Sequence, residues 1–213
     1  MASPENEGAG RPGQLDATPE LGDELLAGRR HRIGRMPRDM PGPMAAYVLL
    51  VDNLNLWVGR IVAWLVLPLM LAMVYEITAR YFFAAPTIWA YDTSRMLYGA
   101  MFMLGAGYAL SRGVHIRADF IYQRWSVRTQ GRVDAALYLC LYFPALLIFA
   151  VVAWQYAATA IVRGERGMDT AWMPPLGPIK AALAAGVILL VLQGLSELCK
   201  SWYAATRGRW PDA

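Results

Sequence analysis

An apolar stretch from about Ala135 to Ile161, free of charged side chains, constrains this 213-residue chain more than any other feature. About 20 mostly apolar residues carry an α-helix across the roughly 30 Å of bilayer hydrocarbon. Three further stretches qualify, from about Leu56 to Tyr75, from about Arg95 to Leu110 and from about Ala181 to Leu198. Their continuous apolar character favours helices over a barrel, since backbone polar groups in lipid must be satisfied within each segment. The sequence therefore predicts an all-α membrane protein with four transmembrane helices.

The composition supports this class. Hydrophobic residues make up 57% of the chain and charged residues only 17%, which is too apolar for an ordinary soluble domain. The two cysteines, Cys140 and Cys199, lie in or near apolar runs and have no His or Cys neighbours at metal-ligand spacing. We therefore expect packing cysteines, with no disulfide framework, no bound metal and no cofactor.

Basic residues between the predicted helices give the orientation. The connection between the second and third helices holds five arginines, whereas the next connection holds Arg163, Arg166 and Lys180, offset by Glu165 and Asp169. Cytoplasmic loops carry the excess of Lys and Arg, so the five-arginine connection is predicted to be cytoplasmic. With four helices both termini then lie in the cytoplasm, and we expect a bacterial inner-membrane protein. Basic loops also account for the net charge of +4, so no nucleic-acid partner is expected.

Three regions are predicted along the chain. Residues 1–43 hold Gly, Pro and charged residues, and are expected to form a disordered cytoplasmic tail without a signal peptide. Residues 44–205 are expected to form the transmembrane domain, and residues 206–213 a cytoplasmic C-terminal tail. An interfacial helix can start in the segment 47–57, and the segment 120–133 fits an amphipathic helix and a solvated basic loop equally well.

Charged pairs mark the outer ends of the first and second predicted helices. Glu76 and Arg80 are four residues apart, so they share one helix face and can form an ion pair. Asp92 and Arg95 open the second helix, where the macrodipole favours an acidic side chain. The short turn 82–87 is expected to bring the two pairs close together. We favour an ion-pair network that sets the angle between the helices; a docking site for a partner or a substrate gate stays open as the alternative.

At the inner end of the second helix, His115, Arg117 and Asp119 form an H-x-R-x-D sequence. A capping and interfacial anchor cluster is preferred here over a proton relay. Metal or haem binding would need a second ligand, and the other histidine, His31, lies in the predicted tail.

Other charges and two prolines lie within or beside the predicted helices. Arg60, Glu197 and Lys200 are expected to extend their charged groups to the inner membrane interface. Pro68 and Pro144 each predict a kink. No predicted helix carries an acidic residue at its midplane, so an ion-coupled substrate site is not expected in this chain. No nucleophile constellation, phosphate loop or carboxylate pair is evident, so the chain is not expected to be an enzyme.

Several of these residues follow one another in a characteristic order: Glu76, Arg80, Trp89, Asp92, Arg95, Gly105, Arg112, Gly113, His115, Arg117 and Asp119. The set resembles the small membrane subunit, of the DctQ type, of tripartite ATP-independent periplasmic (TRAP) transporters. In that family the first helix ends with Glu-x-x-x-Arg, and the second opens with Trp, an acidic residue and Arg. The resemblance covers about residues 50–205 and departs at Asp92, where the family more often has Glu.

The resemblance implies a division of labour. A soluble periplasmic binding protein captures a small organic acid anion, and a large multi-span permease subunit binds sodium ions and moves the substrate by an elevator motion. The small subunit steadies the static scaffold, so the implied partners of this chain are the large subunit, the binding protein and membrane lipid. Nine residues are expected to order the helices or to contact the large subunit: Glu76, Arg80, Trp89, Asp92, Arg95, Arg112, His115, Arg117 and Asp119.

Two other classes of function are weighed against this one. A self-contained four-span transporter or channel would work as a homo-oligomer, but small exporters of that kind carry a functional Glu within the first helix, whereas Glu76 lies near its outer end. A haem-bearing anchor of a respiratory enzyme would need axial ligands. Dicarboxylates, 2-oxo acids, sugar acids and aromatic acids all remain open as substrates of the complex.

Overall fold

The computed structural model describes residues 40–112 and 125–211. The chain divides into two units, Met1–His31 and Arg32–Ala213, and the described residues all belong to the second. Its helices are α2 (Gly42–Ala63), α3 (Val66–Phe82), α4 (Ala90–Ser111), α6 (Val127–Leu137), the π-helical turn η1 (Tyr138–Tyr142), α7 (Phe143–Arg163) and α8 (Gly177–Arg207). The predicted all-α class is confirmed for these residues.

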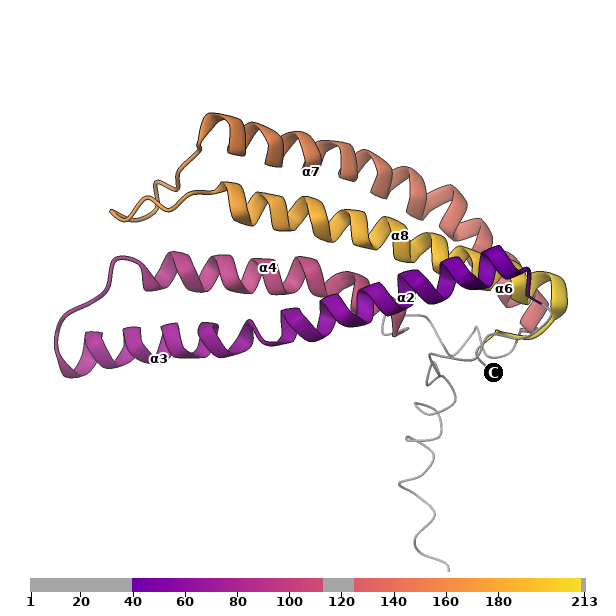
Figure 1. Ribbon diagram of the computed structural model, residues 1–213, viewed down its shortest axis with the longest axis horizontal. Helices are drawn as coiled ribbons and strands as arrows, with labels where there is room; N and C mark the ends of the chain where they lie inside the picture. Colours follow the sequence, from indigo (N-terminus) through magenta and orange to yellow (C-terminus); the bar gives the residue numbers. More distant parts are fainter. Residues whose placement is uncertain (1–39, 113–124, 212–213) are drawn as a thin grey trace, which may run out of the picture. The chain divides into compact units, whose positions relative to one another are not determined.

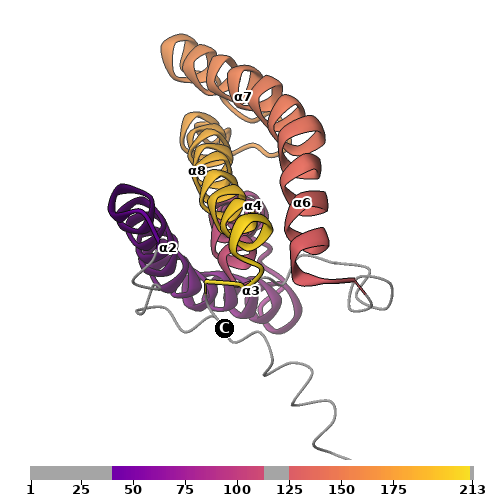
Figure 2. The same cartoon turned by 90° about the vertical axis from the view of Figure 1, so that its right-hand side faces the viewer.

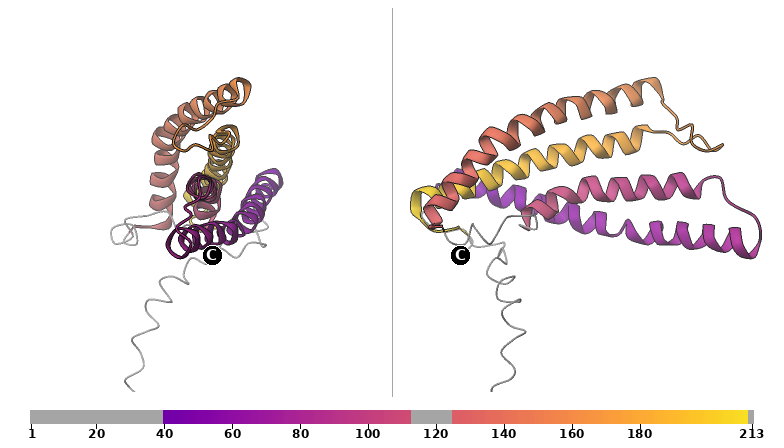
Figure 3. Two further views of the ribbon diagram at one scale, coloured as in Figure 1. Left: turned by 90° about the vertical axis from the view of Figure 1, so that its left-hand side faces the viewer. Right: turned by 180° about the vertical axis from the view of Figure 1, so that it is seen from behind.

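The helices run back and forth between two ends (Figures 1 and 3). α3 continues α2 toward one end, where a short turn leads into α4, which returns beside α3 (Figure 1). α7 runs toward the same end, and the loop 164–176 leads back into α8. We call this the loop end. The start of α2, the helix α6 and the end of α8 lie at the opposite end, called the α6 end (Figure 1).

A break at residues 64–65 separates α2 from α3. Pro68 has no backbone N–H, and its ring would clash with the carbonyl four residues earlier, which belongs to Trp64. That carbonyl instead accepts a hydrogen bond from the N–H of Leu67, three residues on, at 3.2 Å. The kink predicted at Pro68 is therefore present, and the first predicted span, from about Leu56 to Tyr75, straddles two helices.

The second proline also marks a change in helix geometry. Before Pro144, the N–H of Phe143 donates to the carbonyl of Tyr138, five residues back, and the intervening residues form η1. Such π-turns occur where the regular hydrogen-bond ladder of a helix is interrupted. As a result α6, η1 and α7 form one continuous helical path that bends between its two ends (Figure 2).

α8 is the central helix and packs against α2, α4, α6 and α7. α8 comes close to the backbone of α4 at Gly186, where an added Cβ would lie only 2.5 Å from the carbonyl oxygen of Met103. On its other side, Ala184 packs in a buried cluster with Ala153 and Ala157 of α7. Small residues of this kind let helices approach closely in lipid, where van der Waals packing drives association.

Among the described residues, three helical segments are long and apolar enough to cross a membrane: Gly42–Phe82, Val127–Arg163 and Gly177–Arg207. They contain the first, third and fourth predicted spans and extend beyond them. The second predicted span corresponds to α4, a helix of 22 residues that is not one of the three. Polar residues in its first two turns, including Asp92 and Arg95, and three glycines lower its apolar content.

Candidate functional site

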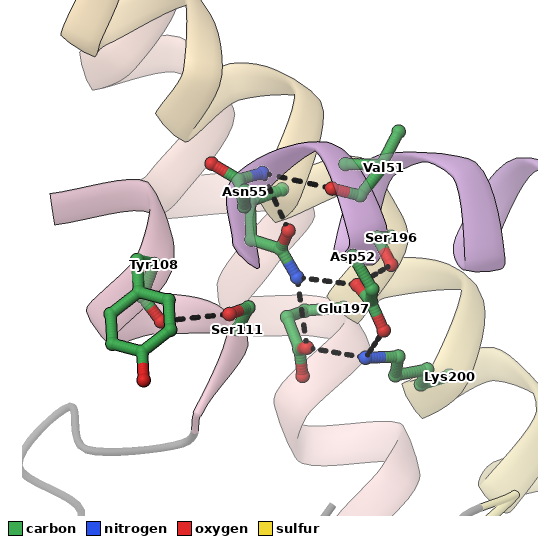
Figure 4. Close-up of polar contacts among 9 residues, drawn as sticks. Val51, Asp52, Asn55, Tyr108, Ser111, Ser196, Glu197 and Lys200 are labelled. Carbon is green, nitrogen blue, oxygen red and sulfur yellow. Dashed lines mark hydrogen bonds and ion pairs between the residues drawn. The ribbon is translucent and has the colours of Figure 1, made fainter. Parts of the chain in front are cut away.

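A buried polar network ties α2 to α8 toward the α6 end (Figure 4). Asp52 of α2 accepts hydrogen bonds from Gln193 at 2.8 Å and from the hydroxyl of Ser196 at 2.9 Å. Its other oxygen pairs with the ammonium group of Lys200 at 2.7 Å, and that group also lies 2.9 Å from Glu197. The Lys200 side chain is only 1% exposed. The network therefore meets the condition for burying charges, which is an opposite charge together with hydrogen bonds.

Asn55 extends this network toward α4. Its amide group donates to the carbonyl of Val51 at 3.2 Å and to the side-chain oxygen of Gln193 at 2.8 Å. Its own carbonyl oxygen lies against Gly107 of α4, where an added Cβ would collide with it. That oxygen is buried and has no hydrogen-bond partner in the part of the chain that the structure describes. Asn55 thus lies where α2, α4 and α8 meet.

The expectation that Glu197 and Lys200 extend to the membrane interface is wrong, because both side chains are buried. The sequence holds a signal for this arrangement, since α8 carries four polar residues at spacings of three and four: Gln193, Ser196, Glu197 and Lys200. Residues so spaced share one helix face. Asp52 and Asn55, three apart, form a matching polar face on α2. Their partnership spans 148 residues between Asp52 and Lys200, so it depends on which helices become neighbours.

At the loop end, Glu76 and Arg80 of α3 form the ion pair that their spacing predicts, with 2.9 Å between the Arg80 Nε and a Glu76 oxygen. The other oxygen of Glu76 accepts hydrogen bonds from the backbone N–H of Thr87, at 3.0 Å, and from its hydroxyl. Thr87 lies in the turn before α4, so Glu76 fixes the connection between α3 and α4. Trp89 stacks on Tyr75 beside it, with 5.7 Å between ring centroids.

Asp92, in the first turn of α4, and Arg95, in the second, hold the loop between α7 and α8. Asp92 is fully buried and accepts a hydrogen bond from the hydroxyl of Thr170. Arg95 pairs with Asp169 and also lies 3.3 Å from Asp92. Within the described ranges no ion pair joins these residues to the pair on α3, so the two predicted pairs hold two different connections.

A further ion pair at the loop end was not singled out from the sequence. Lys180, in the first turn of α8, pairs with Glu165, which follows α7. The same ammonium group lies 3.7 Å from the ring centroid of Tyr156 on α7, a cation–π contact. Lys180 and Glu165 are 15 residues apart, a spacing with no helical period, so only the packing of α7 against α8 reveals the pair.

The remaining predicted residues lie at the other end of α4. Arg112 follows the last turn of this helix, and its guanidinium group lies 5.4 Å from the ring centroid of Tyr108. His115, Arg117 and Asp119 lie outside the described residues, as do residues 1–39 of the predicted tail. The nine predicted residues therefore do not form a single cluster in the part that is described.

Large apolar side chains cover much of the outer surface of the helices. In α3 the one buried residue is Ala72. The exposed large side chains of this helix are Val66, Leu67, Met70, Leu71, Met73, Val74, Tyr75, Ile77, Tyr81 and Phe82. An apolar surface of this extent marks contact with lipid or with a protein partner.

The side-chain contacts at the two ends hold helices and loops against one another. Within the described ranges, no group of three or more His, Cys, Asp or Glu residues could hold a metal ion. Ion pairs between different elements occur at both ends, through Lys200 at the α6 end and through Arg95 and Lys180 at the loop end.

Long apolar helices, an apolar outer surface and ion pairs that join different elements define a multi-helix membrane protein. Residues 69–203 match the family described as tripartite ATP-independent periplasmic transporters, DctQ component. The match covers more than half of the chain, and the protein belongs to this family, the small permease subunits of TRAP transporters. No curated protein matches the sequence significantly. The matched segment begins within α3 and ends within α8, so Asp52 and Asn55 precede it.

Proposed function

We propose that this chain is the static scaffold subunit of its TRAP transporter and takes no part in the chemistry of transport. The observation that carries the proposal is the presence of polar ties at both ends of the helices. Asp52 and Lys200 join α2 to α8 at the α6 end, while Asp92 and Arg95 join α4 to the α7–α8 loop. Breaking a buried ion pair such as that of Asp52 and Lys200 costs about 3–5 kcal/mol. A group of helices with polar ties at its two ends resists sliding of one helix past another, as a fixed frame beside a moving domain must.

In this proposal four helical segments cross the bacterial inner membrane, and both termini lie in the cytoplasm. α4 is about 33 Å long, from 22 residues at about 1.5 Å each, which matches the hydrocarbon thickness. It runs beside α3 and α8 (Figures 1 and 3). Because α4 packs against α2, α3 and α8, it needs less lipid-facing apolar surface than a peripheral helix. Basic residues at the start of α6 favour the cytoplasmic side for the α6 end.

We assign the contact with the large subunit to α3. This helix packs mainly against α4 and buries only Ala72, so most of its surface is available to a partner. Exposed aromatic side chains, which are enriched at protein interfaces, gather toward its loop end at Tyr75, Tyr81 and Phe82. The Arg80 side chain, 54% exposed, adds a polar group on the same helix.

Sodium coupling and substrate selection are assigned to the other components. The large elevator subunit would move a small organic acid anion that a periplasmic binding protein delivers. The support for this assignment is the family membership, with its division of labour, and no substrate is derived from the side chains of this chain.

Purification of the tagged chain from its native membrane in mild detergent, followed by mass spectrometry, tests the proposal. We expect a stoichiometric and much larger polytopic permease to accompany the chain. Replacing Arg80 with Ala should reduce that recovery, whereas Arg163→Ala, an exposed arginine at the end of α7, should not. Recovery of homo-oligomers alone would contradict the proposal and support the self-contained transporter.

The assigned face is tested by photo-crosslinking within the same complex. Cys140 and Cys199 are first replaced by Ala, and a single cysteine is then placed at Met73 on α3 or at Ile148 on α7, both exposed positions. A benzophenone maleimide on Met73→Cys should link to the large subunit, and the same label on Ile148→Cys should not. The reverse result would move the partner to α7 while leaving the scaffold function in place.

A further inference from the structure

Two adjoining cavities lie between α6 and α8 at the α6 end, beside the start of α2. The larger has a volume of about 500 Å³ and is lined mostly by apolar side chains, including Leu139 and Leu198. The smaller, of about 370 Å³, is lined by Arg128 and Arg132. Arg132 and Trp202 line both. An apolar cavity thus opens directly beside a basic one.

The two arginines lie four residues apart on α6, on one helix face, and both are exposed. Neither has an ion-pair or hydrogen-bond partner among the residues that the structure describes. Asp134, on the same helix, is buried and has an interaction of its own. Arg128 lies beside the end of α8, where an added Cβ on Gly208 would be 3.1 Å from its Nε. Like charges at this spacing repel, and an anion placed between them relieves the repulsion.

Exposed tryptophans place these cavities at a membrane surface. Trp125 precedes α6, and Trp202 of α8 lines both cavities with 62% of its surface exposed. Tryptophan is enriched at the level of lipid headgroups. In the proposed orientation, on which this step rests, the surface is that of the cytoplasmic leaflet, whose anionic lipids attract basic clusters.

We propose that the two cavities bind one anionic phospholipid. Its phosphodiester lies between the guanidinium groups of Arg128 and Arg132, and one acyl chain occupies the apolar cavity beside Leu139 and Leu198. The planar guanidinium fork matches the geometry of phosphate oxygens. The cavity of about 500 Å³ has the size of ordinary small-molecule sites. A protein helix is about 10 Å wide, so this volume would hold little more than one of its turns. An acyl chain therefore fits it better than a protein helix.

Native mass spectrometry of the purified full-length chain, titrated with phosphatidylglycerol, tests the proposal. One molecule should bind, and more tightly than phosphatidylcholine with the same acyl chains. The double variant Arg128→Gln/Arg132→Gln should bind phosphatidylglycerol about tenfold more weakly or worse. The matched variant Arg60→Gln/Arg163→Gln, which removes two exposed charges away from both cavities, should bind it as the unmodified chain does.

A second variant tests the apolar cavity without changing charge. Ala136, an exposed residue that lines the larger cavity, is replaced by Trp to fill it, and binding of the phospholipid should weaken. Glycerol phosphate at the same concentration should not compete, because it lacks the acyl chain. Unfolding temperatures in lipid-free detergent, equal for all variants, establish that each one folds.

Equal binding of phosphatidylglycerol to both double variants would overturn the proposal. So would competition by glycerol phosphate, or a crosslink from Ala136→Cys to the large subunit in the intact complex, which would place protein in the groove. Phospholipid binding is measured on the isolated chain. Absence of binding would therefore leave the proposed scaffold function in place, and failure to recover the large subunit would leave the phospholipid result unaffected.

Discussion

Lys200 shows how a charged side chain can stabilise helices from the inside of a membrane protein. Its ammonium group lies between Asp52 on α2 and Glu197 on its own helix, and water is excluded from it. Desolvating such a group is costly, and the geometry of the pair with its added hydrogen bonds offsets the cost. Removing Lys200 alone is therefore worse than removing it together with Asp52, because it leaves the buried Asp52 carboxylate without its counter-charge.

Replacement of Lys200 with Ala should destabilise the protein by about 3–5 kcal/mol, since the Asp52 carboxylate loses its buried counter-charge. The double variant Lys200→Met/Asp52→Asn should recover part of this loss. Apparent unfolding temperature in detergent measures both effects. Arg207→Ala, an exposed cation on the same helix, serves as the control and should change stability by less than about 0.5 kcal/mol. A Lys200 variant as stable as this control would show that the ion pair contributes little.

Gly186 and Gly105 give a matched pair of substitutions. A Cβ at Gly186 would meet the backbone of Met103, whereas a Cβ at Gly105 would meet nothing within 4 Å. Gly186→Ala should therefore push α4 from α8 and cost about 1–3 kcal/mol. Gly105→Ala should be neutral or stabilise the helix by up to about 1 kcal/mol. The unfolding temperatures of the two variants test this prediction. Equal changes in unfolding temperature would mean that α4 and α8 can move apart at Gly186 without loss of stability.

The loop between α7 and α8 depends on α4 for its position. Asp92 and Arg95 reach it from the first two turns of that helix, and within the loop the N–H of Leu176 donates to the carbonyl of Glu165 at 2.9 Å. The side-chain contacts connect the loop to an element that is distant in sequence. The loop is thereby held by α4, a helix that neither precedes nor follows it in the sequence.

Asp92→Ala should loosen this loop, because Thr170 loses its acceptor and Arg95 loses a nearby carboxylate. Trypsin should then cleave after the exposed Arg166 several times faster than in the unmodified protein. Gel analysis of a time course gives the rate. Tyr98→Ala, an exposed substitution on the same helix, should leave the rate unchanged. Unchanged cleavage in the Asp92 variant would mean that the backbone bonds alone hold the loop.

The path of the whole chain through the membrane depends on α4. If α4 crosses, the α3–α4 turn and the start of α6 lie on opposite sides. In a chain without Cys140 and Cys199, Ala85→Cys should react with an impermeant maleimide in intact cells, and Ser126→Cys only after permeabilisation. Met168→Cys, in the exposed α7–α8 loop, should react from outside like the first. Labelling of Ala85 and Ser126 from the same side would show that α4 does not cross.

Local features were predictable from the sequence because their physics acts within a few residues. The long apolar stretches, the changes in helix geometry at Pro68 and Pro144 and the ion pair between Glu76 and Arg80 all depend on neighbours along one helix. Span bounds were less accurate, since a helix can continue beyond the apolar stretch that marks it. α2 begins at Gly42, and its first half packs against α8, with Val48 buried beside Tyr203, so this part does not need the character of a free membrane span.

Length, hydropathy and helical period thus established a multi-helix membrane protein and, with the ordered motif, its family. They could not show which helices become neighbours, and that choice decides the environment of every charged side chain. The spacing of Lys200 from Glu197 is the same whichever way α8 faces. On a face turned to lipid Lys200 would be an exposed anchor, whereas on the face packed against α2 it is a buried counter-ion of Asp52. The packing of α2, α4 and α7 around α8 decided between these outcomes, because burial and pairing are properties of the space between helices.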